Sequence, residues 1–312
     1  MSTSASPLPA AAFGARWLGV ALCALSAAGF ASLSILGKFA FAEGLSLPGM
    51  LSLRFGGAAL ILVAFFALRD RRLLFPGARL CLALLALGAI GYAGQSTLYF
   101  IGLRRLPASL SSLLLYVYPA FVALLNWAVY RQPVARREWG ALALAFLGVT
   151  LTVDPVNAFA LQTGAFDILG AACVLGSAVW YAGYIVGSAW VVRRVAPMVS
   201  TAWICAGAAL TFTVGGLAVG DLRWSLSPEG WAIVAGMILI STILAVGTFL
   251  AGVARLGPTV ASLLSTLEPV FTVALAGLLL GERLAPAQTA GGGMVLAAVI
   301  LLNLRKAPDH ST

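Results

Sequence analysis

Charged residues are scarce in this chain, and their scarcity excludes a soluble protein. Only 9% of its 312 residues are charged, whereas 61% are hydrophobic. Soluble domains are roughly one half apolar and one quarter charged. The composition therefore predicts an integral membrane protein that has the lipid bilayer as its main surroundings.

Histidine is nearly absent, and the cysteines form no recognisable pattern. The one histidine, His310, lies in a polar tail, which excludes a histidine-based metal site or catalytic triad within the membrane. The four cysteines all fall inside apolar runs, and none has a partner at metal-ligand spacing. We therefore expect no metal, no cofactor and no disulfide framework. The cysteines are Cys23, Cys81, Cys173 and Cys205.

The net charge of +9 does not indicate a nucleic-acid partner, because the basic residues form short clusters between apolar runs. That distribution is typical of membrane topology signals. The loops expected on the same side of the membrane as the N-terminus hold most of the Lys and Arg residues. This bias predicts that both termini face the cytoplasm. Arg16 precedes an apolar run long enough to span, without a signal-peptide pattern, so we expect a retained first helix.

Ten apolar segments approach the length of about 20 residues that a spanning helix needs. They are 17–38, 47–68, 80–101, 108–130, 138–153, 166–190, 198–219, 231–254, 259–280 and 287–304. No linker is long enough for a soluble domain. The predicted organisation is a disordered cytoplasmic N-terminus (1–16), a first repeat (17–153), a loop (154–165), a second repeat (166–304) and a cytoplasmic tail (305–312).

One stretch of sequence occurs twice at a constant spacing. The matched pairs are Gly102/Gly252, Arg105/Arg255, Ser112/Ser262, Pro119/Pro269 and Phe121/Phe271. Such self-similarity is the mark of an internal repeat. Since five is an odd number of helices, the second half must enter the membrane in the opposite orientation. The sequence thus predicts an all-α integral membrane protein with ten transmembrane helices as two inverted five-helix repeats, the architecture of alternating-access transporters.

Pro119 and Pro269 lie inside long apolar runs, where each removes a helical hydrogen bond. We interpret them as hinge points in helices 4 and 9, related by the internal symmetry. The alternative is that both are prolines of the kind that membrane helices tolerate without consequence.

These features resemble the ten-helix drug/metabolite transporter superfamily, in its EamA-type branch. The motifs that carry the resemblance are Tyr118-Pro119, Glu268-Pro269, Gly281-Glu282-Arg283 and a sixth-helix run from Ser177 to Tyr181. One departure is Arg131-Gln132-Pro133, where the family usually has a Gly-Glu pair. The resemblance implies a transporter of the bacterial cytoplasmic (inner) membrane, similar to exporters of aromatic amino acids and of some cationic dyes.

Three ionisable residues fall within predicted spans, where charge is costly and often functional. Glu268 precedes the second proline, and its role stays open. It either faces a cavity, where it could recognise an amine or carry a proton, or it forms hydrogen bonds between helices. Arg54 could meet a substrate carboxylate, but we favour snorkelling of its side chain to the outer surface. Lys38, near the end of the first helix, is also expected to snorkel.

Polar and aromatic residues share one face in several spans, because they recur at spacings of three and four. An aromatic, weakly polar cavity would suit an amphipathic solute. The alternative is that the aromatic residues form interfacial belts. The predicted substrate-binding residues are Tyr92, Gln95, Ser96 and Tyr99 in helix 3; Ser177, Trp180, Tyr181 and Tyr184 in helix 6; Ser241 and Thr248 in helix 8; and Glu268 in helix 9.

Three functions follow from these patterns. The first is export of small amphipathic metabolites, above all neutral or aromatic amino acids, either coupled to protons or by facilitated diffusion. The second is efflux of lipophilic cations, with Glu268 as counter-charge. The third is a membrane enzyme or sensor, for which the sequence offers neither a nucleophile–base pair nor an appended soluble domain. We expect a small-molecule partner and no nucleic acid, and a monomer suffices for this architecture.

Overall fold

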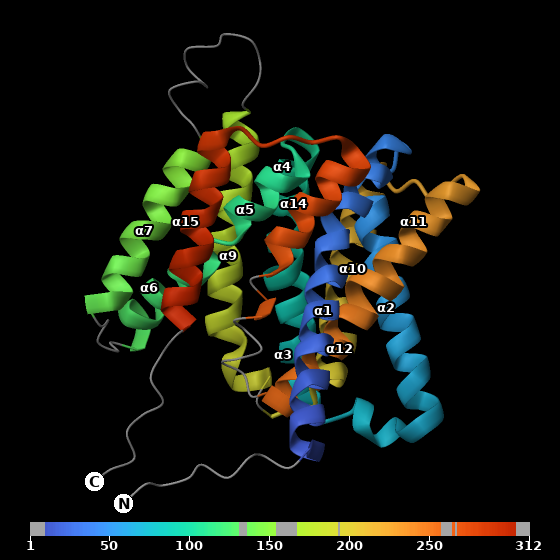
Figure 1. The fold of residues 1–312 in the computed structure, drawn as a ribbon. Helices are drawn as coiled ribbons and strands as arrows, with labels where there is room; N and C mark the ends of the chain where they lie inside the picture. The colour runs from blue at the N-terminus through green and yellow to red at the C-terminus, as the bar shows by residue number, and fades with distance from the viewer. Residues whose placement is uncertain are drawn as a thin grey trace, which may run out of the picture.

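The computed structural model describes residues 10–130, 136–153, 167–192, 194–256, 264–265 and 267–303. Within these ranges every regular element is helical (Figure 1). The elements of the first half are α1 (Ala10–Ala42), α2 (Leu47–Asp70), η1 (Arg71–Leu74), α3 (Ala78–Ala86), η2 (Leu87–Tyr92), α4 (Ala93–Arg105), α5 (Ala108–Leu115), α6 (Tyr118–Tyr130) and α7 (Arg136–Val153). Those of the second half are α9 (Ile168–Val192), α10 (Pro197–Ala218), α11 (Pro228–Ile238), η3 (Leu239–Leu244), α12 (Ala245–Leu256), α14 (Leu267–Leu280) and α15 (Pro286–Asn303).

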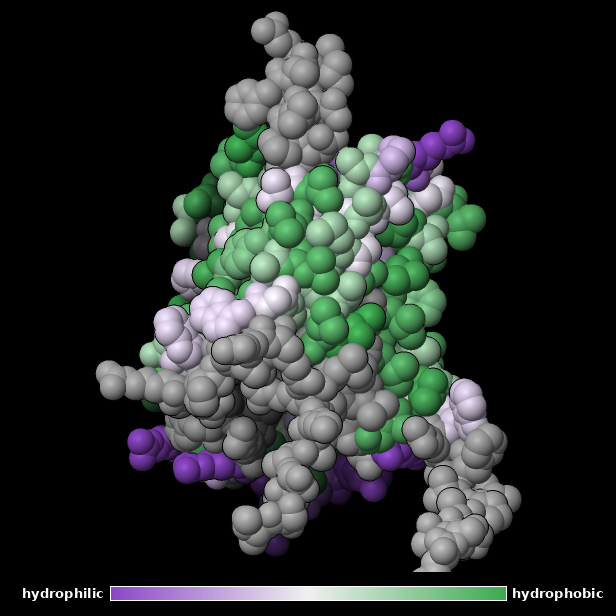
Figure 2. Space-filling view, turned by 60° about the vertical axis from the view of Figure 1, so that its left-hand side comes forward, coloured by the Kyte–Doolittle hydropathy of each residue, from purple (hydrophilic) through white to green (hydrophobic). Residues whose placement is uncertain are grey.

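The predicted ten-helix architecture is confirmed. Seven helical spans of the described chain are long and apolar enough to cross a membrane, and Trp139–Leu151 and Leu267–Leu280 are shorter apolar helices. With α15 they correspond one to one to the predicted segments. Apolar side chains cover the middle of the visible surface, and hydrophilic side chains gather towards its two ends (Figure 2). This is the distribution that a lipid-embedded bundle requires.

Three predicted segments lie partly or wholly outside the described residues. They are the N-terminus up to residue 9, the loop 154–165 and the tail 305–312. The predicted disordered segment 1–16 overlaps α1, which begins at Ala10 in an alanine-rich stretch with high helix propensity. Residues 131–135, which hold the departure from the family motif, are also outside the description.

Helix pairing follows the internal symmetry. The second helix of each half packs against the other, as α2 with α10, and the fifth helices pair as α7 with α15. The first helix of one half packs against the third of the other, in both directions: α1 lies along α12, and α4 along α9. Exchange of the two halves maps this set of pairs onto itself, as two inverted repeats require. These pairs join one half of the chain to the other.

The third helix of each half contains a π-helical turn that the sequence did not predict. These turns are η2 and η3, at corresponding positions of the two repeats. Within η3 the Thr242 hydroxyl donates to the carbonyl of Met237, five residues earlier. A π turn inserts one extra residue and redirects the side chains that follow, and such turns are frequent at functional sites. Both turns contribute to the central cavity described below.

The fourth span is interrupted before its proline rather than at it. Helix α5 ends at Leu115 and α6 begins at Tyr118, so that Pro119 lies in the first turn of α6. Proline is favoured there because its missing N–H is needed least in a first turn. The missing bond is the one to the carbonyl of Leu115, four residues earlier. The interruption therefore falls at Tyr116 and Val117.

Glu282 fixes the start of α5 to the end of α14. Its carboxylate accepts hydrogen bonds from the backbone N–H groups of Ala108, at 2.7 Å, and Ser109, at 3.0 Å, and from the Ser109 hydroxyl at 2.8 Å. A carboxylate at a helix N-terminus satisfies N–H groups that have no helical partner. Gly281 turns the chain here with φ +67°, a value that glycine adopts readily. The Gly281-Glu282 motif thus joins the fourth and ninth spans at one end.

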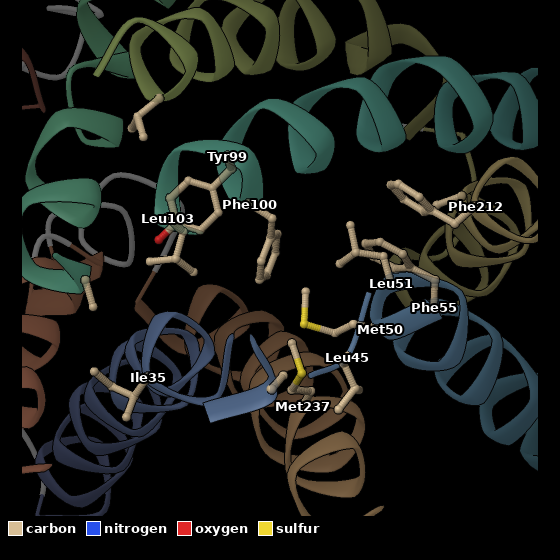
Figure 3. Close-up of a cluster of buried hydrophobic side chains, with 14 of the residues drawn as sticks. Ile35, Leu45, Met50, Leu51, Phe55, Tyr99, Phe100, Leu103, Phe212 and Met237 are labelled. Atoms are coloured by element: carbon tan, nitrogen blue, oxygen red, sulfur yellow. The ribbon is translucent and has the colours of Figure 1, made fainter. Parts of the chain in front are cut away.

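The largest buried apolar cluster joins α1, α2, α4, α10 and α11 (Figure 3). Within it, Phe55 of α2 is stacked against Phe212 of α10 with ring centroids 5.9 Å apart. Met50 and Met237 fill the adjoining space. This cluster packs α2 against α10 and α11 beside the cavity.

Glycines allow two backbones to touch where the third span crosses the seventh. A Cβ at Gly207 of α10 would overlap the carbonyl of Leu85, and one at Gly88 would overlap the carbonyl of Ile204. Small residues at helix crossings are typical of membrane proteins, where close packing replaces the hydrophobic effect between helices. The crossing therefore depends on both glycines.

We expect Gly207→Ala to lower the stability of the protein by about 1–3 kcal/mol, the usual cost of overpacking a close contact. Thermal unfolding of the purified protein in detergent measures this as a lower apparent Tm. Gly215→Ala on the same helix is the matched control, since a Cβ there has no neighbour within 4 Å. Equal melting temperatures for the two variants would contradict the packing role of Gly207.

Candidate functional site

The two repeats enclose a central cavity of about 320 Å³. Side chains of α1, α2, η2 and α4 form part of its wall, and side chains of α9, α10, η3, α12 and α14 form the rest. Tyr116 and Tyr118 reach it from the interruption of the fourth span. A cavity of this size lies at the lower end of the range of roughly 300–1,000 Å³ for small-molecule sites.

Seven of the predicted substrate-binding residues line this cavity. They are Tyr92, Gln95, Ser96, Tyr99, Tyr181, Tyr184 and Glu268. Gln95 and Ser96 are held by a short network, in which the Ser96 hydroxyl donates to the Gln95 side-chain oxygen at 3.3 Å. The Tyr99 hydroxyl shares a hydrogen bond of 2.7 Å with Ser34 of α1. The polar faces predicted for helices 3 and 6 therefore meet at one place.

Four other predicted residues lie outside the cavity wall. Ser177 is fully buried between α4 and α9, where it accepts from the Gln95 amide and donates to the Gln95 carbonyl. Trp180 is 45% exposed, and its indole N–H donates to the Gly91 carbonyl at 2.9 Å. Ser241 bonds Ser32 of α1, and the Thr248 hydroxyl donates within its own helix. Ser177, Trp180 and Ser241 form hydrogen bonds between helices, and Thr248 bonds the backbone of the preceding helical turn.

Six aromatic rings form a continuous wall along the cavity. Each ring contacts the next at a centroid distance of 4.9–5.9 Å. The order is Phe55, Tyr92, Tyr184, Tyr181, Tyr118 and Tyr116. Such a wall offers ring faces for stacking together with hydroxyl groups for polar contacts. It can accommodate an amphipathic solute with an aromatic or aliphatic side chain.

Glu268 lies at the Tyr116 end of this aromatic wall. The Tyr116 hydroxyl is 3.1 Å from its Oε2 and also donates to the carbonyl of Ser265. Pro269 and Ser265 are four residues apart, so Pro269 has no N–H with which to bond that carbonyl in a helical manner. Within the described chain no basic side chain lies within 4.0 Å of the Glu268 carboxylate. Its charge therefore remains available to the cavity.

Arg54 lies at the other end of the wall, which corrects the expectation that its side chain snorkels to the surface. It is 3% exposed, its Nε donates to Thr242 at 3.2 Å, and its Cζ lies 4.7 Å from the centre of the Phe55 ring. Arg54 is about two turns into α2 and faces η3, so neighbouring helices separate it from lipid. Lys38 is partly exposed.

Tyr116, Tyr118, Ser34 and Thr242 also contact the cavity but were not among the predicted site residues. Tyr116 and Tyr118 are two residues apart, a spacing that places them on different faces of a regular helix. The interruption of the fourth span brings both to the same wall, where their rings lie 5.8 Å apart. The proline three residues after Tyr116 was the one available indication.

Comparison with curated proteins finds several membrane transporters. The "Threonine/homoserine exporter RhtA" of Escherichia coli (strain K12) is 27% identical over 288 residues, which cover 90% of each chain. The "Uncharacterized transporter sll1319" of Synechocystis sp. is 28% identical over 67% of this chain and 63% of that protein. The "Uncharacterized inner membrane transporter YedA" of Escherichia coli (strain K12) is 24% identical over 82% of this chain and 81% of that one.

A solved crystal structure shares the fold across nearly the whole chain. It superposes with a TM-score of 0.62 at 18% identity and covers 93% of this chain and 96% of its own. The model of the EamA-like transporter family matches the chain twice, over residues 17–154 and 168–304, one match in each half. This multi-pass membrane protein is a transporter rather than an enzyme, and the chain belongs to the EamA-like transporter family.

Proposed function

We propose that this chain exports small amphipathic metabolites, with neutral and aromatic amino acids as principal substrates. The observation that carries the proposal is the aromatic wall with Glu268 at one end and Arg54 at the other. Rings accept the apolar side chain, and the two charges complement a zwitterion. The name of RhtA, a threonine/homoserine exporter, supports amino acids as the solute class.

Alternating access would carry the solute across. The fourth and ninth spans bend near Pro119 and Pro269, and the cavity between the inverted repeats opens to one side at a time. The interruption of the fourth span at Tyr116 and Val117 supports this role, since a break in the helical bonding is where a bend costs least. We place the protein in the bacterial inner membrane with both termini in the cytoplasm, as the distribution of basic residues favours.

Efflux of lipophilic cations is the second candidate function. It is favoured by the unpaired carboxylate of Glu268 beside several tyrosine rings, which attract cations by their faces. Arg54 opposes it, because a second positive charge in the same cavity repels a cation. The two functions therefore differ in which charge of the cavity dominates.

Flux into liposomes that contain the purified protein tests the proposal. We expect saturable counterflow of neutral and aromatic amino acids, and none in protein-free liposomes. A pH gradient that accelerates the flux would add proton coupling, while equal flux with and without the gradient means facilitated diffusion. Absence of flux for every amino acid, together with uptake of ethidium or viologen, would replace export of amino acids by cation efflux.

A further inference from the structure

Arg54 is the one charged side chain among the most deeply buried polar residues of the described chain. It is 3% exposed and contributes to the wall of the central cavity. No carboxylate lies within 4.0 Å of its guanidinium in the part of the chain that the structure describes. A charge in such surroundings is costly unless it is paired. An unpaired guanidinium beside a cavity therefore calls for an anionic partner that enters from outside.

The neighbours of Arg54 orient its side chain without neutralising it. Its Nε donates to the Thr242 hydroxyl, and its guanidinium lies over the ring of Phe55. Phe55 is itself stacked on Phe212 and fully buried, so the platform beneath the guanidinium is rigid. Arginine has five N–H donors, and one bond through Nε leaves the two terminal nitrogens for other partners. Two parallel N–H groups match the two oxygens of a carboxylate.

The other groups around the cavity limit what the anion can be. Glu268 lies in the same cavity and would repel a solute that carries only negative charge. Between Glu268 and Arg54 runs the aromatic wall, which provides ring faces and hydroxyls. A monocarboxylate that also carries an amine and an apolar side chain fits this combination. A phosphate ester, with two negative charges and no amine, does not.

We propose that Arg54 binds the carboxylate of the transported solute and so makes the protein select carboxylated amines over their decarboxylated counterparts. This inference rests on the proposed export of amino acids and adds a specificity-determining residue to it. The π turn η3 takes part, because it places Thr242 where its hydroxyl holds Nε. The ring of an aromatic amino acid would then lie along the tyrosines, starting at Tyr92, whose ring packs against Phe55 with centroids 5.5 Å apart.

Three ligands with the same ring separate the contributions of the two charges. Phenylalanine carries both the carboxylate and the amine, phenethylamine lacks the carboxylate, and 3-phenylpropionate lacks the amine. Binding to the purified protein and flux in liposomes are measured for each ligand. The quantity of interest is the ratio of phenylalanine to phenethylamine affinity within one protein variant. This ratio does not depend on how much of the variant is correctly folded.

In Arg54→Gln we expect this ratio to fall by about 10- to 100-fold, the range for a lost hydrogen bond between charged groups. Phenylalanine and 3-phenylpropionate should weaken, while phenethylamine binds as before or more tightly. Arg54→Lys keeps the charge without the planar pair of donors, so its ratio should fall by less. It also supplies the test if the glutamine variant does not fold. Arg104→Gln is the matched control, since Arg104 also lies over a phenylalanine ring but is exposed outside the cavity.

The outcomes separate this inference from the proposed function. If the wild-type protein transports phenylalanine and both Arg54 variants keep the wild-type ratio, the carboxylate site is overturned while amino-acid export stands. An equal loss of all three ligands in the folded variants assigns Arg54 a purely structural role and also overturns it. If the wild-type protein takes phenethylamine but no phenylalanine, the proposed function fails, and the carboxylate site fails with it.

Discussion

Glu268→Gln is expected to reduce the transport of amine-bearing solutes by at least about tenfold. Glutamine has the same size as glutamate and retains an oxygen that can accept from the Tyr116 hydroxyl, so the contact between the fourth and ninth spans persists. The variant loses the negative charge and has an NH2 group in place of one carboxylate oxygen. A hydrogen bond between charged groups contributes about 1.5–3 kcal/mol, and 1.4 kcal/mol is a factor of ten in affinity.

The loss should follow the amine of the solute. Counterflow of phenylalanine and of phenethylamine should both fall, whereas binding of 3-phenylpropionate, which has no amine, should hold or improve. Glu229→Gln is the control, because Glu229 is an exposed carboxylate in the first turn of α11, outside the cavity. Unchanged flux of phenylalanine in Glu268→Gln would leave Glu268 as a link between helices and remove it from the substrate site.

The same variant decides whether Glu268 carries a proton. If flux of the wild-type protein increases with a pH gradient, Glu268→Gln should lose that increase, because its amide does not titrate. A variant whose residual flux still responds to the gradient as the wild type does would exclude proton transfer through this residue. Amine recognition and proton transfer are thus separated by two measurements on one protein.

The number of the helices and their arrangement as two inverted repeats could be predicted because each depends on features that repeat along the sequence. Apolar runs of about 20 residues have few alternatives to a spanning helix. The matched prolines and glycines revealed the inverted repeat, and the matches of the family model to both halves agree with it. The cavity-lining face of helix 3 followed from regular spacing, since Gln95, Ser96 and Tyr99 lie within little more than one turn of a regular helix, α4.

The rest of the site depends on departures from regular helices, which periodicity cannot detect. The interruption at Tyr116 brings two tyrosines to the cavity wall, and the π turn η3 places Thr242 beside Arg54. Trp180 shows the converse case, because its place on a polar stripe suggested the cavity but its half-exposed ring bonds the Gly91 carbonyl and is not among the cavity-lining side chains. The direction of the Arg54 side chain depends on which helix packs against α2, and that contact is not encoded within α2 itself.

Pro269→Ala is expected to slow transport by about tenfold or more while the affinity for the solute changes little. Pro269 is the third residue of α14, and an alanine there would supply the backbone N–H that proline lacks, which favours a helix continuous with the residues before it. The new N–H of residue 269 would bond the carbonyl of Ser265, which in the wild-type protein accepts from the Tyr116 hydroxyl. The ninth span would become stiffer and would lose one contact to the fourth.

A helix that bends less should exchange more slowly between the two open states without altering the side chains that bind the solute. The measurements are therefore the Kd for phenylalanine, which we expect to stay within about threefold, and the rate of counterflow, which should fall. Pro286→Ala is the matched control, since Pro286 is the first residue of α15, where proline interrupts no helical bond. A Pro269→Ala protein with wild-type counterflow would show that the ninth span moves without bending at its proline. The tyrosine bond to Ser265 would then hold the two spans together as a rigid unit, and the bend would have to lie at Tyr116 and Val117 in the fourth span alone.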